Sequence, residues 1–420
     1  MSSTTLTVVA DRCWDGTSDH PAGPTAVTVA DGVIVSVTSA AEIPPEADVV
    51  WLGARTLLPG LIDCHVHLVD EAHDSRLTAY QTLSALPAMK AMLEAGFTTA
   101  RDLGGAHDPI NVALRQAVEN GLVEGPRLIV APNIISVPGG HGDKMPELSE
   151  RYGVDVGTLA DTPDRLRSLV REQARVGADW IKLTASGGFS SPADAPDHVA
   201  FTVEEMTAIV TTARDHGLPC AAHAFNDEAV RRALAAGVRS IEHANLASAE
   251  TFARIADHGA FLCPTLHALR QFIDNLDDDD FWAGRDPRMR AQIRTHAPRI
   301  RESAADLADS EVRIAFGTDA GMFPHGDAWR EFRDLTDAGL SPLRALRAAT
   351  SVAADLLERP ELGRITPGAA ADLVAVAGDP FADIDAMGRV EFVVRAGAVA
   401  IDRTGDPTSA HRREHRPATA

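Results

Sequence analysis

The chain has 420 residues, of which 45% are hydrophobic, 24% charged and 5% aromatic, and this globular composition excludes collagen-like, low-complexity and disordered proteins. Lys and Arg total 39 against 60 Asp and Glu, so the formal net charge is −21. Such an acidic balance argues against nucleic acid or an anionic membrane as the partner and favours a small-molecule substrate. One core stops growing at about 250–300 residues, so we expect one large domain with a smaller one attached.

Cysteine usage and the first residues point to the cytoplasm. None of the four cysteines forms a C-x-x-C pair, and three lie in apolar runs, as buried thiols do. The N-terminal residues lack a basic segment followed by an apolar one, so we expect no secretory signal. No stretch approaches about 18 consecutive apolar residues, so we expect no membrane span. These patterns predict a cytoplasmic protein without a membrane partner.

Both ends of the chain are typical of β structure. Thr5–Ala10 is a short apolar run, and Ala26–Val37 predicts two strands around Asp31-Gly32, a strong hairpin signal. The other end carries three more β segments: Asp372–Val376, Val390–Val394 and Ala398–Ile401. We therefore predict a small β-sandwich domain built from both termini, residues 1–57 and 360–420.

Residues 58–359 alternate short apolar runs with helical stretches. The strand candidates are Leu57–Val66, Thr98–Leu103, Arg127–Ala131, Trp180–Ala185, Leu218–His223, Ser240–His243, Ala260–Thr265 and Arg313–Gly317. The helix candidates include Leu83–Ala95, Pro163–Val176, Val203–His216, Glu228–Ala236 and Ala249–His258. This order predicts an α/β fold, a (β/α)8 TIM barrel. A doubly wound open sheet is the alternative, but no G-x-G-x-x-G follows the first strand.

The segment 267–311 stands apart from this alternation. It is long and contains an acidic run, Asp277–Asp280. We expect the segment to be a long connection in which the acidic run is a solvated loop, with an active-site lid as the alternative interpretation of that run.

The most informative motif is His65-Val66-His67 at the end of the first strand of the predicted barrel. Side chains at i and i+2 share one face of a strand, and at the C-terminal end of a barrel strand that face is the active-site mouth. Two imidazoles there suit Zn²⁺, although H-x-H alone is a weak signal. Asp63 shares this face one step deeper, where we expect it to orient a ligand histidine rather than to approach a metal.

Four further strand ends carry groups that can bind metal or transfer protons: Lys182, His223, His243 and Asp319. Each has an ordinary interpretation, as a solvated lysine, a hydrogen-bonded core histidine or a turn-forming aspartate. Those interpretations leave the distribution unexplained, because five different strand ends are involved. Catalytic groups drawn from several strand ends are typical of a TIM barrel.

These residues, with the segments LPGLIDCHVHL, FTTARDLGG, GGHG, ADWIKLTASGG and FGTDAG, resemble the amidohydrolase superfamily over nearly the whole chain. More narrowly, the chain resembles imidazolonepropionase-like and Xaa-Pro-dipeptidase-like members. The resemblance implies a centre with two divalent ions, for which Zn²⁺ is our expectation, although ligand type constrains the metal only loosely. His65, His67 and Asp319 would hold one ion, His223 and His243 the other, and Lys182, as N6-carboxylysine, would bridge both.

The same resemblance implies a mechanism and a set of substrate contacts. Metal-activated water would attack a carbonyl, and Asp319 would carry its proton to the departing nitrogen. His141, in the GGHG segment, is expected to touch the substrate, with lower expectations for Ser186, Gly187, Phe225 and His325.

Two smaller expectations concern neighbours of these residues. Some dipeptidase-like relatives carry a carboxylate-binding tyrosine where this chain has Phe225, and this change leaves room for substrates without a carboxylate. Arg101 and Asp102 are expected to form a structural ion pair near the mouth, and the remaining histidines are expected to be non-catalytic.

The sequence therefore predicts an amidohydrolase that cleaves a C–N bond in a small molecule, with an N-acyl amino acid or dipeptide as the leading substrate. A carbamate or phenylurea compound and a cyclic amide such as an imidazolone are alternatives. A mononuclear deaminase variant and a non-catalytic, metal-containing binding barrel are also open. We expect a homo-oligomer.

Overall fold

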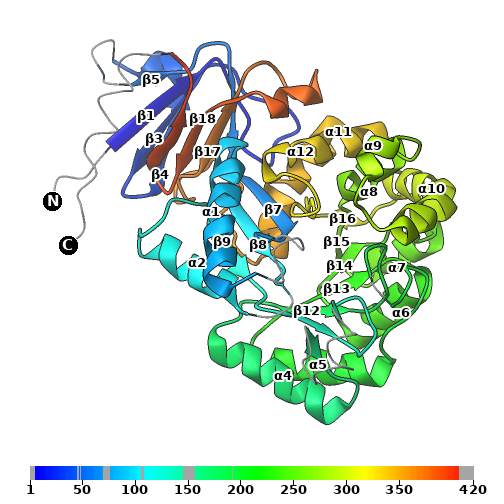
Figure 1. Cartoon of the computed structure of the whole chain (residues 1–420). Coiled ribbons are helices and arrows are strands. Elements are labelled where there is room, and N and C mark those ends of the chain that lie inside the picture. The colour runs from blue at the N-terminus through cyan, green and yellow to red at the C-terminus, as the bar shows by residue number, and fades with distance from the viewer. Residues whose placement is uncertain are drawn as a thin grey trace.

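The structure is a computed structural model, and it describes residues 5–44, 47, 49–69, 76–105, 108–144, 157–191 and 193–405. Two β sheets at one side of the molecule adjoin a larger body in which strands alternate with helices (Figure 1). Among the helices of the described ranges, none is both long and apolar enough to cross a lipid bilayer.

Strands from near the two ends of the chain form the two smaller sheets. One has the order β4-β3-β1-β5 and the other the order β19-β18-β17-β6-β2. Their strands are β1 Thr5–Ala10, β2 Arg12–Cys13, β3 Thr25–Ala30, β4 Val33–Ser39, β5 Val50–Trp51, β6 Thr56–Pro59, β17 Leu373–Val376, β18 Val390–Arg395 and β19 Ala398–Asp402. The second sheet joins strands from both ends, since β6 pairs with β17 on one side and β2 on the other. The predicted N-terminal strands Thr5–Ala10 and Ala26–Val37 lie in the first sheet instead.

The predicted hairpin of β3 and β4 is also confirmed. Asp31 and Gly32 both have positive φ angles, 52° and 79°, as a type I′ turn requires. Short 3₁₀ helices lie at η1 Ala40–Glu42 and η4 Ile384–Gly388.

The larger body contains two parallel sheets. The three-stranded sheet has the order β7-β8-β9, and the seven-stranded sheet has the order β11-β10-β12-β13-β14-β15-β16. Their strands are β7 Leu61–Val66, β8 Phe97–Asp102, β9 Arg127–Val130, β10 Ile134–Ser136, β11 Thr158–Leu159, β12 Ile181–Thr184, β13 Cys220–Ala224, β14 Ser240–His243, β15 Phe261–Cys263 and β16 Arg313–Ile314. Each of the eight predicted runs overlaps one of these strands, whereas β10 and β11 were not predicted.

Backbone hydrogen bonds connect the two parallel sheets at both edges of the three-stranded sheet. Cys64 of β7 donates its N–H to Phe316, just after β16, over 2.7 Å. At the other edge, Asp179, just before β12, donates to Val130 of β9 over 2.9 Å. The carboxyl ends of β7, β12, β13 and β14 therefore come near one another.

The apolar run Leu57–Val66, predicted as one strand, is two strands. Gly60 separates β6, which belongs to the sheet with β17, from β7, which begins the parallel sheets. A Cβ at residue 60 would lie 2.2 Å from Oγ1 of Thr98 and 2.7 Å from Cβ of Asp372. The chain can change sheets here because glycine permits this close approach.

Helices surround the parallel strands. Their bounds are α1 Thr78–Glu94, α2 Ile110–Glu119, α4 Pro163–Val176, α5 Val203–Asp215, α6 Asp227–Ala236, α7 Ala249–Asp257, α8 Leu266–Asp274, α9 Asp279–Trp282, α10 Pro287–Ala308, α11 Arg330–Asp337, α12 Pro342–Ala348 and α13 Ser351–Leu356, with a 3₁₀ helix, η3, at His325–Asp327. The five helices predicted from the sequence are confirmed. Thr202 and Glu205 form a capping box at the start of α5, which explains its sharp beginning.

The segment 267–311 is mostly helical, in α8, α9 and α10. The acidic run Asp277–Asp280 is exposed, as predicted, but only its first two residues lie in a loop, because Asp279 and Asp280 begin α9. The acidic run supplies the cap of α9, because Asp278 accepts hydrogen bonds from the N–H groups of Asp280 and Phe281. Asp279 of α9 pairs with Arg290 of α10 over 2.7 Å. Carboxylates of the acidic run therefore cap one helix and connect it to the next.

Candidate active site

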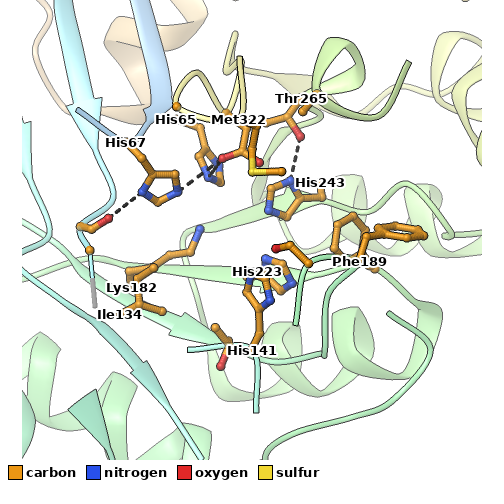
Figure 2. A pocket seen from close by; sticks show the side chains of 18 of the residues that line it. His65, His67, Ile134, His141, Lys182, Phe189, His223, His243, Thr265 and Met322 are labelled. Carbon is orange, nitrogen blue, oxygen red and sulfur yellow. Dashed lines mark hydrogen bonds and ion pairs between the residues drawn. The ribbon is translucent and has the colours of Figure 1, made fainter. Parts of the chain in front are cut away.

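The residues predicted from the strand ends meet in one cavity of about 890 Å³, including the solvent at its mouth. The wall contains all six predicted metal ligands: His65, His67, Lys182, His223, His243 and Asp319. Figure 2 shows the labelled histidines and Lys182 pointing into a common space. They come from β7, β12, β13, β14 and the turn after β16.

Backbone strain is concentrated at these strand ends. His243 and Asp319 have φ angles of 74° and 60°, and Ala244 has 53°. This left-handed conformation is energetically unfavourable for a residue other than glycine, and residues in it are often found at functional sites. At these two strand ends the strained backbone carries the side chains into the cavity.

Three side chains come close enough to share one ion. Single ligand atoms of His65, His243 and Asp319 all lie within 4.8 Å of one another. Nε2 of His65 and Nε2 of His67 each lie 3.4 Å from Oδ1 of Asp319. The ring centroids of His223 and His243 are 4.7 Å apart, so both predicted ligand groups lie in the same cluster.

Hydrogen bonds behind three histidines fix which ring nitrogen faces the cavity. Nδ1 of His65 lies 2.8 Å from Oε2 of Glu242, and Nδ1 of His67 lies 2.6 Å from the carbonyl of Gly104. Because a carboxylate or a carbonyl only accepts, both Nδ1 atoms carry a proton, and in the neutral form of either ring Nε2 is the atom with the lone pair. Nδ1 of His243 is hydrogen-bonded to Oγ1 of Thr265 over 2.7 Å.

His223 has the opposite arrangement. Its Nε2 donates to the carbonyl of Gly187 over 3.0 Å, which leaves Nδ1 as the atom with a lone pair. Burial lowers the pKa of His223 to about 3 and lowers the pKa values of His65 and His243 well below their usual range. All three imidazoles are therefore neutral at pH 7, the form that binds metal.

Lys182 lies at the bottom of the cavity and is only 2% exposed. Burial lowers the pKa of its ammonium group to about 8. A lowered pKa makes the uncharged amine accessible near neutral pH, and the uncharged amine is the form that can react with CO₂.

The donor set fits a divalent metal ion. Nε2 of His65 is buried and has no hydrogen-bond partner, and the neighbouring donors are imidazole nitrogens and a carboxylate, the ligands that Zn²⁺ prefers. The carboxylate behind His65 is the partner that a metal-binding histidine usually has. These side chains are therefore the ones that would hold an ion.

Asp63 supports the site and does not line it. Its Oδ1 accepts the N–H groups of His65 and Thr318, and its Oδ2 accepts the hydroxyl of Thr318 over 2.6 Å. Because Asp319 follows Thr318 directly, Asp63 ties the His65 strand to the turn that presents Asp319.

The predicted substrate contacts divide into two groups. His141 and Phe225 line the cavity, whereas the lining does not include Ser186, Gly187 or His325. The ring of His141 stacks on His223 at a centroid distance of 4.3 Å.

The residues outside the lining support those inside it. Ser186 accepts the N–H of Phe225 over 3.0 Å, and Gly187 accepts from His223. His325 donates from Nε2 to the carbonyl of His67 over 3.0 Å. These hydrogen bonds position residues of the wall.

Arg101 and Asp102 do not pair with each other, so that prediction is wrong. Successive residues of a strand point to opposite faces. Arg101 is fully buried and lies 2.9 Å from Glu242, with Trp180 beneath its guanidinium at 4.4 Å. Asp102 accepts the N–H groups of Leu68 and Gly104 and the amide of Asn111 instead.

Sequence reasoning missed Glu242 and Thr265, which hold His65 and His243. Glu242 is a carboxylate in the buried strand Ser240–His243, and a charge in a buried strand beside a predicted metal ligand was the available signal. Thr265 carried no such signal. Two histidines predicted to be non-catalytic, His73 and His107, lie outside the described residues.

Comparison with known proteins gives the family. The model of the amidohydrolase family matches residues 56–400, so this chain belongs to the amidohydrolase family. The predicted resemblance to that superfamily is confirmed. Members of this family generally bind metals and hydrolyse amide bonds.

Three relatives are similar over most of their length. An ochratoxinase of Aspergillus niger is 28% identical over 400 residues, with 87% of this chain and 80% of the relative covered. The solved structure of a Xaa-Pro dipeptidase with bound methionine is 29% identical and superimposes with a TM-score of 0.87 over 95% of this chain and all of the other. A prolidase complexed with N-methylphosphonate-L-proline is 33% identical, with a TM-score of 0.85 over the same shares.

Proposed function

We propose that this chain is a metal-dependent amidohydrolase that cleaves the amide C–N bond of an N-acyl amino acid or a dipeptide. The observation that supports this most is the convergence of His65, His243 and Asp319 within 4.8 Å in a cavity lined by three further potential ligands. The relatives whose names state a dipeptidase and a prolidase support the substrate class.

The proposed centre has two divalent ions, with Zn²⁺ as the first candidate. His65, His67 and Asp319 would hold one ion, His223 and His243 the other, and carboxylated Lys182 would be the shared ligand. When bound, such ions polarise a carbonyl and lower the pKa of water toward about 7.

The protein's own residues would handle the proton and the substrate. Asp319 lies 3.4 Å from two ligand nitrogens, so its carboxylate can accept the proton of the attacking water and donate it to the departing nitrogen. His141 would touch the substrate carbonyl from the side of His223, on which it stacks. Ser191 fixes the ring of His141 by a hydrogen bond of 2.7 Å at Nδ1.

The proposal includes the architecture that carries the centre. The two parallel sheets would form one closed (β/α)8 barrel from residues 58–359, supported by the backbone hydrogen bonds from β7 to the β16 side and from β9 to the β12 side. Residues 1–57 and 360–420 would form the composite β-sandwich domain. We keep the expectation of a homo-oligomer within the proposal.

A second candidate function is hydrolysis of a carbamate, phenylurea or cyclic amide. Phe225 lines the cavity and stacks on His243 at 4.8 Å, and its ring offers no hydroxyl to a carboxylate. A site without that donor discriminates less against substrates that have no carboxylate.

The test is an assay of the metal-loaded protein on N-acetyl amino acids, dipeptides, aryl carbamates and an imidazolone, with metal content measured in parallel. We expect about two ions per chain and hydrolysis of the N-acyl amino acids or dipeptides. Asp319→Asn should lower kcat roughly 10²–10⁴-fold. His258→Ala, at the exposed end of α7, is the control and should keep full activity.

Several outcomes separate the alternatives. Activity confined to substrates without a carboxylate would reject the leading substrate class. Full turnover by Asp319→Asn, or no hydrolysis across the panel, would favour a binding barrel. One ion per chain with unmodified Lys182 would favour a mononuclear deaminase variant. Partial rescue of Lys182→Ala by short carboxylates would support the bridging role.

A further inference from the structure

The cavity has an apolar side that the proposed chemistry does not use. Five side chains form this side, which we call the apolar wall: Phe189, Phe225, Leu269, Met289 and Met322. The ring of Phe225 stacks on the ring of His243 at 4.8 Å and 18°, so the wall begins directly beside a predicted metal ligand. Figure 2 shows Phe189 on the far side of His243 from Lys182.

Two residues of the wall lie on helices of the segment 267–311. Leu269 lies on α8 and Met289 on α10, and both belong to an apolar cluster with Phe272, Ile293 and Ile300 of the same two helices. Their neighbours outside the cavity are therefore packed side chains. Close packing holds such groups in one arrangement.

Hydrogen bonds attach this helical segment to the strand end that carries His243. The hydroxyl of Ser303 on α10 donates to the carbonyl of Ala244 over 3.1 Å. Arg299 donates to the carbonyl of Leu246 over 3.3 Å. Phe189 and Phe225 meet edge to face at 5.0 Å. The wall is thus positioned relative to the reacting centre.

The chemistry of the wall restricts what can lie against it. None of the five side chains carries an N–H or O–H group, and thioether sulfur is only a weak acceptor. A polar group placed there would lose water without gaining a partner. An aromatic or branched aliphatic group would gain by leaving water, and methionine and aromatic side chains adapt well to such groups.

We propose that the apolar wall is a specificity subsite for a bulky apolar group, aromatic or branched aliphatic, next to the scissile amide. The inference rests on the proposed amidohydrolase function and extends it to a substrate class. The wall, to which segment 267–311 contributes Leu269 and Met289, then influences which amides are cleaved, and the strand-end residues determine how they are cleaved.

Two matched substrate series test the subsite on the metal-loaded protein. One series is N-acetyl, N-isobutyryl and N-phenylacetyl glycine; the other is the N-acetyl derivatives of glycine, leucine and phenylalanine. We expect kcat/KM to rise about 10-fold or more from the smallest to the bulkiest member of at least one series. Equal values throughout both series would overturn the inference and leave the proposed function intact.

Two aspartate variants on one helix test the location. Met289 lines the cavity, whereas Ala291, two residues further along α10, is exposed. Met289→Asp should lower kcat/KM for the bulky substrate about 10-fold or more and change the acetylglycine value much less. Ala291→Asp introduces the same charge and should change neither value. Equal loss on both substrates in Met289→Asp would contradict the proposal.

A truncation and a binding measurement cover the remaining outcomes. Met289→Ala widens the wall without adding charge, and it should shift the preference toward still larger groups. If no amide in the panel is hydrolysed, the proposed function fails, and the subsite is then decided by calorimetry with phenylacetate and acetate. About tenfold tighter binding of phenylacetate would support the subsite, and equal binding would reject it.

Discussion

Two groups of three side chains in this molecule have the same composition, a histidine, a carboxylate and an arginine. In the first, which we call the inner triad, Nδ1 of His65 lies 2.8 Å from Glu242, and the other oxygen of Glu242 lies 2.9 Å from Arg101. The three side chains are 1%, 0% and 0% exposed. Nε2 of His65 faces the cavity beside Asp319.

The second group, the outer triad, lies between α8 and α11. Nδ1 of His267 is 2.6 Å from Asp334, and Arg270 is 3.5 Å from the other oxygen of Asp334. Here the arginine is 42% exposed. The ring of His267 packs edge-on against Phe323 at 4.7 Å, and His267 is not part of the cavity wall.

The difference shows that the composition of such a triad does not decide its role. Both carboxylates fix a histidine tautomer, but the inner triad turns Nε2 toward a cavity with other metal-binding groups, and the outer triad turns its ring toward an apolar side chain. Burial also changes the energetics, since a fully buried charge depends on its partner far more than an exposed one. Three experiments test whether the two triads and their surroundings differ in this way.

The largest expected difference is in stability. Arg101→Met leaves Glu242 buried without its cation, so we expect the free energy of unfolding to fall by about 3–5 kcal/mol. Arg270→Met removes a half-exposed partner and should cost about 1 kcal/mol or less. Urea unfolding of both variants measures the difference. Equal losses would show that burial does not separate the two triads.

A smaller difference is expected in metal binding. Glu242→Gln removes the negative charge behind His65 and should weaken Zn²⁺ binding about 10- to 100-fold. Asp334→Asn makes the same change in the outer triad and should leave metal affinity unchanged. Competition with a chelator of known affinity measures both. Unchanged Zn²⁺ affinity in Glu242→Gln would remove the inner triad from the proposed metal centre.

The smallest difference concerns pH. Glu331 is buried beside the outer triad and accepts the N–H groups of Leu266 and His267 over 2.9 and 2.7 Å. Burial raises the pKa of Glu331 well above its usual value of 4.5, in contrast to Glu242, whose pKa is lowered, with Arg101 the largest lowering influence. A raised carboxyl pKa contributes stability at low pH that is lost as the pH rises above 4.5, about 1.4 kcal/mol for each pKa unit.

Glu331→Gln should therefore lose less stability than the wild type between pH 4.5 and pH 8. Urea unfolding at several pH values measures this slope. Glu250→Gln, at an exposed position on α7, is the control and should follow the wild type. A Glu331→Gln slope identical to that of the wild type would contradict a raised pKa at this position.

The strand ends that carry the candidate metal ligands could be predicted from the amino-acid sequence, because the alternation of apolar runs and helices is a local pattern. It located His65, His67 and His243 at strand ends, and it located the hairpin at Asp31-Gly32, whose turn chemistry lies in two adjacent residues. The family also follows from these local motifs.

Contacts between side chains that are far apart in the sequence could be seen only in the folded structure. Arg101 pairs with Glu242, 141 residues away, rather than with its neighbour Asp102, because adjacent strand residues face opposite sides. Gly60 divides one apolar run between two sheets through its contact with Thr98. The acidic run of segment 267–311 is exposed, as its charges predicted, whereas Leu269 and Met289 of the same segment pack with apolar partners on two helices and line the cavity. Burial depends on such partners, and they are not neighbours in the chain.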